Sequence, residues 1–322
     1  MKNKIKAGII GAAGYAGGEL IRLLLNHPKA ELCFAQSKSS AGKQIHEIHT
    51  DLFGDLDQVF QSEPKPEADL WFLCSGHGEA KQFLQVNPPS PGVRIIDLSQ
   101  DHRSAAAPWV YGLPEYQRNA IRQATHIANP GCFATCIQLA LLPLAQEGML
   151  GSAIHIQATT GSTGAGAIPG ANTHFSWRQN NLSIYKPFGH QHLSEIGETL
   201  RSLQSGFNQE LNFIPLRGGF TRGILASIYM ESPIGKTQLE DQFRRYYESH
   251  PFVSVSSRDV DLKQVVNTNK CLLRVEKHGN KVLITSVIDN LLKGASGQAL
   301  QNMNLMYGFD ESAGLRLKAS AF

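Results

Sequence analysis

The chain has 322 residues, which is long for a single hydrophobic core and suits two, so we expect two domains. Hydrophobic residues make up 42% and charged residues 18% of it, values that exclude a disordered or fibrous chain and indicate a globular enzyme. The net charge is only +3 and the basic residues are scattered, which argues against nucleic acid as a partner.

The apolar stretches and the cysteines predict the compartment. The longest apolar stretches, such as 137–145, fall far short of the ~20 residues that a membrane helix requires, and a strand pattern begins almost at the N-terminus. We therefore expect a cytoplasmic protein with no membrane partner. The five cysteines lie at irregular spacing without a zinc-ligand pattern, so we expect reduced thiols and no bound metal.

A glycine-rich loop follows the first predicted strand. Residues 5–10 form a short apolar run, and glycines at positions 11, 14 and 17 then lead into a helical pattern over 19–25. Glycines let the backbone turn tightly and approach a pyrophosphate, whose charge the helix N-terminus favours. A plain turn is the alternative, but the position directly after the first strand favours a dinucleotide loop. The cofactor contacts predicted there are Gly11, Ala13, Gly14, Tyr15, Ala16 and Gly17.

The second predicted strand, residues 31–35, indicates which dinucleotide binds. The stretch after it, 36–40, holds no carboxylate of the kind that binds the ribose 2′-hydroxyl of NAD. The hydroxyls of Ser37 and Ser39 and the ammonium of Lys38 can instead receive a 2′-phosphate, which predicts NADP(H) as the cofactor. A solvated loop is the alternative interpretation.

Two further apolar runs, 70–74 and 93–98, are typical of strands buried on both faces of a parallel sheet. With helical stretches between them, they predict an α/β, doubly wound fold of the Rossmann type for the first half of the chain. Ser75 directly follows the first run and is a further cofactor-binding candidate. Arg103 follows the second run and can hold a carboxylate or phosphate, with a solvated surface arginine as the alternative.

Cys132 lies at the junction between a turn and a predicted helix. It follows the turn-forming residues Asn129-Pro130-Gly131 and precedes an uninterrupted run over 133–142. Unpaired N–H groups at a helix N-terminus stabilise a thiolate, so Cys132 is a candidate nucleophile. The alternative is a small buried packing residue, which is the role that we expect for Cys136.

The second half of the chain predicts an α+β domain. A strand over 153–159 leads into a glycine-rich loop over 161–166, which is either a phosphate or amide binder or a flexible connection. Further strand patterns predict a largely antiparallel sheet. These patterns cover 223–230, 271–277 and 281–289, with a helix over 239–249 between them.

Two histidines, His190 and His192, offer a base for the thiol and precede a helix-like stretch over 194–200. A surface pair or two metal ligands on a strand are the alternatives. Arg222 lies in another polar loop and is a second candidate for holding a substrate anion. A dinucleotide domain joined to a thiolate and a histidine suggests hydride transfer through a thioester.

Seven segments of the chain occur together and in one order. They are 11–20, 97–103, 111–115, 129–132, 161–166, 190–192 and 289–298. Together they closely resemble the N-acetyl-gamma-glutamyl-phosphate reductase family, which is related to aspartate-semialdehyde dehydrogenase. The segments span nearly the whole chain, which makes the resemblance very specific.

The resemblance implies an NADP-dependent acyl-phosphate reductase of arginine biosynthesis. Cys132 would attack N-acetyl-gamma-glutamyl phosphate, inorganic phosphate would leave, and NADPH would reduce the thioester to N-acetyl-glutamate 5-semialdehyde. His192 would act as acid and base, while His190 would position the thiol or the substrate. The residues expected to contact the substrate are Asn129, Arg103 and Arg222.

The resemblance also implies a domain division. An NADP-binding domain would cover 1–130, and a catalytic and dimerisation domain would cover 131–293. The C-terminal segment, 294–322, would pack back on the first domain through a helix over 297–306. The nicotinamide end of the cofactor would lie against Ser162, Gly164 and Asn290, and the chain would assemble into a dimer or tetramer.

Two departures from the family pattern leave the acyl group open. Gln191 stands where the family usually has arginine, and the loop over 214–223 looks longer than the common form. An N-succinyl substrate is therefore an alternative to the N-acetyl one. Aspartate-semialdehyde dehydrogenase chemistry and a non-catalytic NADP-binding sensor are two further alternatives.

Overall fold

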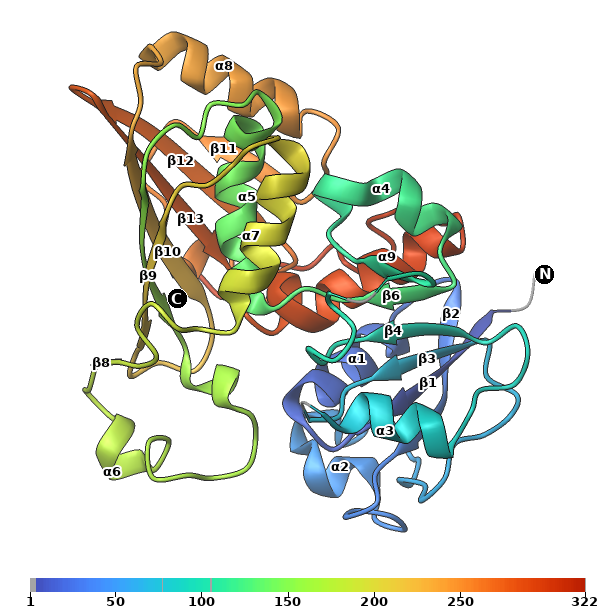
Figure 1. Cartoon of the computed structure of the whole chain (residues 1–322). Helices are drawn as coiled ribbons and strands as arrows, with labels where there is room; N and C mark the ends of the chain where they lie inside the picture. Colours follow the sequence, from blue (N-terminus) through green and yellow to red (C-terminus); the bar gives the residue numbers. More distant parts are fainter. Residues whose placement is uncertain (1–3, 77, 105, 322) are drawn as a thin grey trace. The chain divides into compact units, whose positions relative to one another are not determined.

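The computed structural model describes residues 4–76, 78–104 and 106–321, and the chain divides into two compact units (Figure 1). The first unit runs to Gly131 and takes up the chain again at Ala295–Arg316. The second comprises Cys132–Gly294 and the tail from Leu317. None of the helices in the described part of the chain has both the length and the apolar character that a membrane span needs.

The first unit is built on a six-stranded sheet in the order β2-β1-β3-β4-β6-β5, in which every adjacent pair is parallel. All four residues of β3 are buried, as expected for a strand covered on both faces. The prediction of a doubly wound parallel sheet is confirmed. The strands are β1 (Ile5–Ile10), β2 (Ala30–Gln36), β3 (Leu70–Leu73), β4 (Arg94–Asp97), β5 (Trp109–Tyr111) and β6 (His126–Ala128).

One helix of the first unit comes from the far end of the chain. This helix, α9 (Gly297–Met306), packs against α1, α4 and β4 and is buried at every position. Its polar side chains therefore need partners inside the protein. Asn304, for example, pairs through Oδ1 with Nε2 of His27 at 3.0 Å. The other helices of this unit are α1 (Tyr15–Leu25), α2 (Ile45–Ile48), α3 (Glu79–Val86) and α4 (Pro114–Gln123).

The second unit contains a seven-stranded mixed sheet in the order β11-β12-β13-β10-β7-β9-β8. Its adjacent pairs are antiparallel except for β7–β9 and β11–β12, which confirms the prediction of a largely antiparallel sheet. The β7–β9 pair is parallel because the chain crosses back through α7 between the two strands. The strands are β7 (Ile154–Thr160), β8 (Ser183–Ile184), β9 (Leu211–Arg217), β10 (Ile224–Glu231), β11 (Val253–Ser256), β12 (Cys271–His278) and β13 (Lys281–Ile288).

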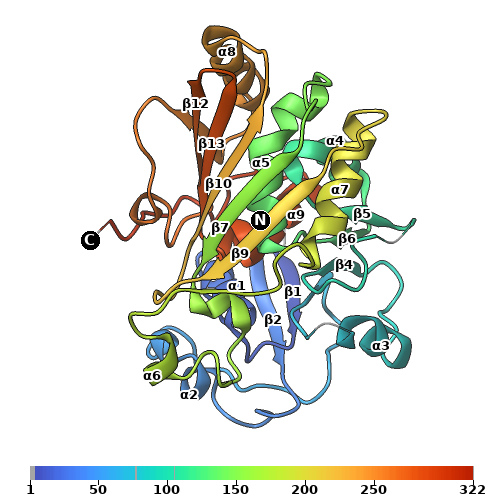
Figure 2. The same ribbon diagram turned by 60° about the vertical axis from the view of Figure 1, so that its left-hand side comes forward.

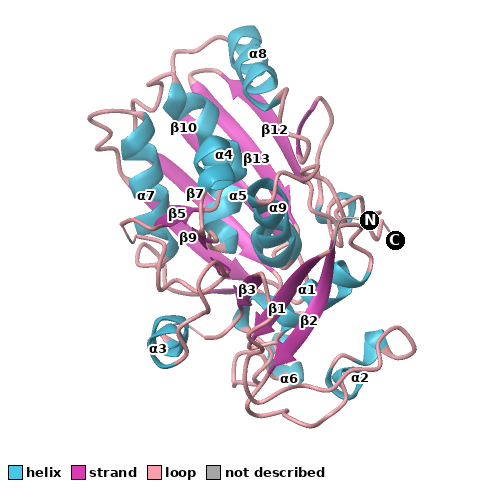
Figure 3. Ribbon diagram, turned by 90° about the vertical axis from the view of Figure 1, so that its right-hand side faces the viewer, coloured by secondary structure: helices cyan, strands magenta, loops and turns pink. Residues whose placement is uncertain are grey.

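Three helices cover one face of this sheet: α5 (Cys132–Gln146), α7 (His192–Leu203) and α8 (Lys236–Tyr247) (Figures 1 and 3). Figure 2 shows β7, β9, β10, β12 and β13 side by side. Within α5, Pro143 has no N–H for the carbonyl of Leu139, and the hydroxyl of Tyr247 donates to that carbonyl instead. A short helix, α6 (Phe175–Arg178), lies in the long connection from β7 to β8.

Candidate active site

Cys132 is the first residue of α5 and directly follows the turn Asn129-Pro130-Gly131 after β6. Its side chain is half-buried, whereas the helix from Phe133 to Ala145 is buried throughout. The first N–H groups of the helix have no acceptors within it and favour a thiolate over a thiol. The start of α5 is therefore the part of this helix at which a reactant can meet a sulfur atom.

Gly294 leaves the space in which the Cys132 side chain sits. A Cβ at position 294 would lie 2.8 Å from Cβ and 3.2 Å from Cα of Cys132, closer than real carbon atoms approach. Gly294 belongs to a π-helical turn, Leu292–Ser296, which Asp289 holds at its start. The Asp289 carboxylate accepts the N–H groups of Leu291 at 2.8 Å and of Leu292 at 3.1 Å. A side chain at position 294 would displace the cysteine.

Asn129 and Arg103, both predicted to bind substrate, support the turn before α5. Asn129 is buried; its Nδ2 donates to the carbonyl of Ala295 at 3.2 Å and its Oδ1 accepts from Nδ2 of Asn302 at 3.0 Å. Arg103 donates from Nε to the carbonyl of Asn129 at 3.0 Å and from Nη2 to the carbonyl of Leu98 at 3.1 Å. These bonds fix the backbone that leads into the cysteine.

His190 is buried in an aromatic surrounding. Its ring centroid lies 5.5 Å from those of Phe133 and Phe213, and 5.7 Å from that of Tyr185. Phe133 is the residue after Cys132 in α5, so the His190 ring is packed against the start of the helix that carries the thiol. The local structure therefore brings an imidazole and the cysteine's helix start together, as the sequence predicted.

His190 is held in its neutral form. Burial, and then the positive charges of Lys186 and Arg217, lower the pKa of its imidazole from 6.5 to about 4. Its Nδ1 accepts the backbone N–H of His192 at 3.2 Å, so the neutral ring carries its proton on Nε2. A neutral imidazole with a fixed Nε2–H can donate a hydrogen bond, and then a proton, to a group that becomes negative.

His192 has a different set of neighbours. It is the first residue of α7, is 6% exposed, and places Nε2 3.8 Å from Oε1 of Glu195 one turn later. Its ring centroid lies 4.6 Å from that of His190. The two predicted histidines are therefore neighbours, but His192 lies beside a carboxylate while His190 lies among aromatic rings and cations.

Tyr185 and Arg217 complete this cluster, and the sequence analysis missed both as site residues. The Arg217 guanidinium lies 4.6 Å above the centre of the Tyr185 ring. Burial, and next the negative charge of Cys132, raise the pKa of the Tyr185 hydroxyl to about 12, which puts this ring near the sulfur. The buried Nε of Arg217 has no hydrogen-bond partner among the described residues. A cation with an open donor near a thiol can hold an anionic reactant.

Arg222, the second predicted anion-binding arginine, is anchored by a carboxylate. Its Nε lies 3.0 Å from Oδ2 of Asp289, whose side chain is fully buried. The same oxygen accepts the backbone N–H of Asn267 at 2.7 Å. Arg222 therefore holds its own loop next to the end of β13.

The second glycine-rich loop, 161–166, is braced by neighbouring segments. Its Thr163 donates both N–H and hydroxyl to the carbonyl of Thr221, at 3.1 and 2.6 Å. Asn290 donates from Nδ2 to the Thr163 hydroxyl at 3.0 Å. Since a Cβ at Gly161 would lie 2.3 Å from the Thr221 carbonyl oxygen, the loop can approach this closely only with glycine there. Three predicted cofactor residues consequently lie together: Ser162, Gly164 and Asn290.

The first glycine-rich loop has the backbone that a dinucleotide requires. Gly11 has a φ of +74°, and a Cβ there would lie 2.9 Å from the backbone of Cys74. A Cβ at Gly17 would lie 2.5 Å from the carbonyl oxygen of Ala12, so α1 packs closely on the loop. Gly14 precedes the first turn of α1, which contains no acidic residue. This helix N-terminus can therefore accept a phosphate.

The hydroxyl groups around this loop also fit a phosphorylated dinucleotide. The Oγ of Ser75, directly after β3, is buried and has no hydrogen-bond partner in the described part of the chain. At the end of β2, Ser37 and Ser39 place their Oγ atoms 3.4 Å apart, and the Lys38 side chain is exposed. Across residues 4–76, 78–104 and 106–321, no group of three or more His, Cys, Asp or Glu side chains is arranged to hold a metal ion.

Known proteins resemble the chain along its whole length. A family model described as the semialdehyde dehydrogenase NAD binding domain matches residues 6–124, and one described as the semialdehyde dehydrogenase dimerisation domain matches residues 132–290. The N-acetyl-gamma-glutamyl-phosphate reductase of Parabacteroides distasonis is 54% identical over 321 residues, covering 99% of this chain and 100% of that protein. The reductase of Phocaeicola vulgatus gives the same values. The chain belongs to the N-acetyl-gamma-glutamyl-phosphate reductase family.

Solved structures share the fold of this reductase family member. An aspartate semialdehyde dehydrogenase II from Vibrio cholerae, complexed with ASA, has a TM-score of 0.75 at 18% identity and covers 95% of this chain and 99% of its own. The aspartate semialdehyde dehydrogenase with NADP from Candida albicans has a TM-score of 0.68 at 15% identity, covering 95% and 99%. The predicted resemblance to the reductase family is confirmed, and the dehydrogenases share its two-domain fold.

Three residues of this reductase family member escaped prediction for different reasons. Arg217 ends β9, and the end of a strand was the signal that singled out Arg103, so a consistent reading would have found it. Asn302 is a polar residue in a helix that is buried all round, a pattern that requires an internal partner. Tyr185 lies in an irregular connection and has no local signal.

Proposed function

We propose that the chain reduces N-acetyl-gamma-glutamyl phosphate to N-acetyl-glutamate 5-semialdehyde with NADPH and releases inorganic phosphate, in arginine biosynthesis. One observation carries the proposal: Cys132 stands at the exposed start of α5 in a chain that is 54% identical throughout to named reductases. The five cysteines are free, as a reducing compartment requires, so we place the reaction in the cytoplasm.

The cofactor proposal rests on the first unit. The glycine loop at Gly11 to Gly17 would hold the pyrophosphate, the hydroxyl of Ser75 would meet a polar atom of the cofactor, and Ser37, Lys38 and Ser39 would hold a 2′-phosphate. The last contact is the reason for proposing NADPH over NADH. When bound, NADPH would supply the hydride that converts the thioester to an aldehyde.

The first chemical step belongs to Cys132. Its thiolate would attack the carbonyl carbon of the acyl phosphate, forming a carbon–sulfur bond, and the carbon–oxygen bond to the phosphate would then break. The guanidinium of Arg217, with an open Nε, would hold an anionic group of the substrate beside the sulfur. Phosphate would leave as the thioester forms.

The contacts favour His190 as the acid–base residue, whereas the sequence alone favoured His192. His190 packs on the residue next to Cys132 and on Tyr185, and its Nε2 carries a proton. That N–H would stabilise the negative charge that develops on the carbonyl oxygen and would protonate the thiolate when the aldehyde leaves. His192, next to Glu195, would hold His190 through its backbone N–H.

A second candidate substrate is the N-succinyl analogue, and one contact favours it. Lys186 is exposed, donates to Oε1 of Gln191 at 3.4 Å, and lies close enough to His190 to lower its pKa. A succinyl group carries a carboxylate that an acetyl group lacks, and the Lys186 ammonium would pair with it. The variant Lys186→Met should then lower kcat/KM for the succinyl substrate more than for the acetyl one.

The test is phosphate-dependent reduction of NADP⁺ by the purified chain, with N-acetyl- and N-succinyl-glutamate semialdehyde offered side by side and aspartate semialdehyde as control. We expect turnover with an acylated substrate, and its loss in Cys132→Ser but not in Cys136→Ser. The Cys132→Ser protein should still bind NADP⁺. Turnover with aspartate semialdehyde alone would overturn the substrate class, and NADP⁺ binding without any turnover by the unchanged chain would indicate a sensor.

A further inference from the structure

Six large apolar side chains are exposed in one segment of the second unit. Residues 168–188, here called the arm, form the excursion from β7 to α7 and include α6 and β8. Each of the six side chains is between 54% and 88% exposed. They are Ile168, Phe175, Trp177, Leu182, Ile184 and Phe188. A contiguous apolar surface of this size on a single copy marks an interaction site.

A buried arginine gives the arm a defined shape. Arg178 is 6% exposed and donates from Nε to the carbonyl of Asn172 at 3.2 Å. Its Nη1 donates to the carbonyl of Arg217 at 2.7 Å and its Nη2 to the hydroxyl of Ser183 at 3.0 Å. The guanidinium thus joins both ends of the arm to β9, the edge of the sheet on which β8 pairs. The apolar side chains are therefore presented by a built structure, which lowers the entropy cost of docking.

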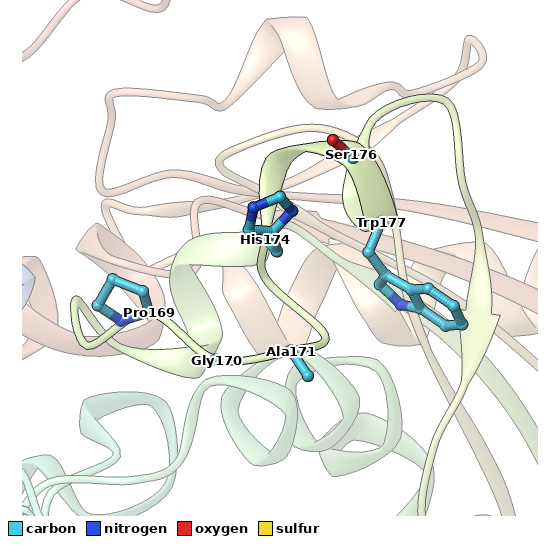
Figure 4. A pocket seen from close by; sticks show the side chains of 6 residues that line it. All are labelled: Pro169, Gly170, Ala171, His174, Ser176 and Trp177. Atoms are coloured by element: carbon cyan, nitrogen blue, oxygen red, sulfur yellow. The ribbon is translucent and has the colours of Figure 1, made fainter.

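The arm contains a hollow as well as projecting side chains. An open hollow of about 560 Å³ is lined by Pro169, Gly170, Ala171, His174, Ser176 and Trp177. Figure 4 shows the chain curving from Pro169 to Trp177, with the indole ring on one side of the hollow and the proline ring on the other. A surface with both knobs and a hollow can pack against a copy of itself related by a two-fold axis.

We propose that the arm docks on a second copy of this chain. The family model that covers 132–290, and with it the whole arm, is described as a dimerisation domain. Six side chains that each expose about half of their surface offer on the order of 600 Å². A stable interface buries ~800 Å² on each partner, so the arm supplies most of the contact that a dimer needs. The occupant is a second copy because the hollow and the knobs occur on the same segment.

The test compares two exposed phenylalanines. Phe175 in the arm is 75% exposed, and Phe53 in the first unit is 78% exposed, so each Phe→Glu change removes a similar apolar surface. We expect Phe175→Glu to raise the dimer dissociation constant, measured by analytical ultracentrifugation of the full chain, by about ten- to hundredfold, because one buried aromatic side chain is worth that much. Phe53→Glu should leave the constant unchanged.

Trp177 gives a second readout that does not depend on a disruptive change. On dilution, its emission should shift to longer wavelength as the copies separate, and the conservative variant Trp177→Phe should abolish that shift while the dimer persists. Two results would overturn the proposal: an unchanged dissociation constant in Phe175→Glu, or a monomer at micromolar concentration, which would assign the arm to another partner. NADP⁺ binding by both glutamate variants reports that each has folded.

Discussion

Two arginines five positions apart, Arg217 and Arg222, show how the second unit separates support from chemistry. Arg222 is paired at 3.0 Å with Asp289, a carboxylate that also accepts backbone N–H groups, so its charge is neutralised inside the fold. Arg217 stacks on Tyr185 and keeps a buried Nε without a hydrogen-bond partner in the described part of the chain. The arginine that a local carboxylate has claimed shapes the site, while the arginine left with an open donor is available to a reactant.

The strongest way to break the supporting region is to remove its carboxylate. Asp289→Ala would leave the Arg222 guanidinium and the N–H groups of Leu291 and Leu292 without their acceptor. We expect a loss of about 3–5 kcal/mol in the free energy of unfolding, as for other broken buried pairs, measured by urea denaturation followed by circular dichroism. Asp241→Ala is the control, because its pair with Arg244 is exposed and is worth at most about 0.5 kcal/mol. A loss of less than about 1 kcal/mol in Asp289→Ala would contradict the supporting role.

The reacting region should respond in the opposite way. Arg217→Met is expected to lower kcat/KM about 10²–10³-fold, the usual effect of removing one positioned donor, while the free energy of unfolding changes by less than about 1 kcal/mol. Arg222→Met should instead lower stability, because it strands the buried carboxylate of Asp289. Steady-state kinetics and urea denaturation of both variants give the two-way comparison. If Arg217→Met lost stability and kept its kcat/KM, the two roles would be exchanged.

The neutral histidine of the reacting region predicts a pH effect on stability. The pKa of His190 is lowered from 6.5 to about 4 in the folded chain, so between these values the unfolded state binds more protons. The free energy of unfolding should therefore fall as the pH drops from about 6.5 to about 4, by roughly 1–3 kcal/mol from this residue. His190→Gln should flatten the slope in part, since burial also lowers the pKa values of His27 and His126. An equal slope in the variant would show that His190 is not the cause.

The smallest expected effect lies in the first unit, at the helix that supports the turn before Cys132. Asn302→Leu removes the bonds from Nδ2 to the carbonyl of Gly112 at 2.8 Å and to Oδ1 of Asn129 at 3.0 Å. We expect a loss of about 1–3 kcal/mol and slower alkylation of Cys132 by iodoacetamide. Asn304→Leu is the control on the same helix. It should lower stability without changing the alkylation rate, because Asn304 donates to the carbonyls of Glu311 and Ala313 instead. Equal alkylation rates in the two variants would separate Asn302 from the thiol.

The parts of this molecule that local rules govern could be predicted from the sequence. The strand, glycine loop and helix at the N-terminus follow from glycine spacing, and the helix start at Cys132 follows from the proline and glycine before it. The roles of the arginines could not be, because Asp289 lies far along the chain from Arg222 and no local pattern marks the pair. Tyr185 reaches the site because β8 pairs with β9, a long-range contact between a very short strand and a strand that is parallel to β7.

The most direct test of the account is the intact mass of the protein after incubation with the acyl phosphate in the absence of NADPH. The account predicts that the chain gains the mass of one acyl group, that the modified peptide contains Cys132, and that Cys136→Ser gains the same mass while Cys132→Ser gains none. An adduct that persists in Cys132→Ser, or no adduct on the unchanged chain while turnover proceeds with NADPH, would contradict the thioester at the start of α5.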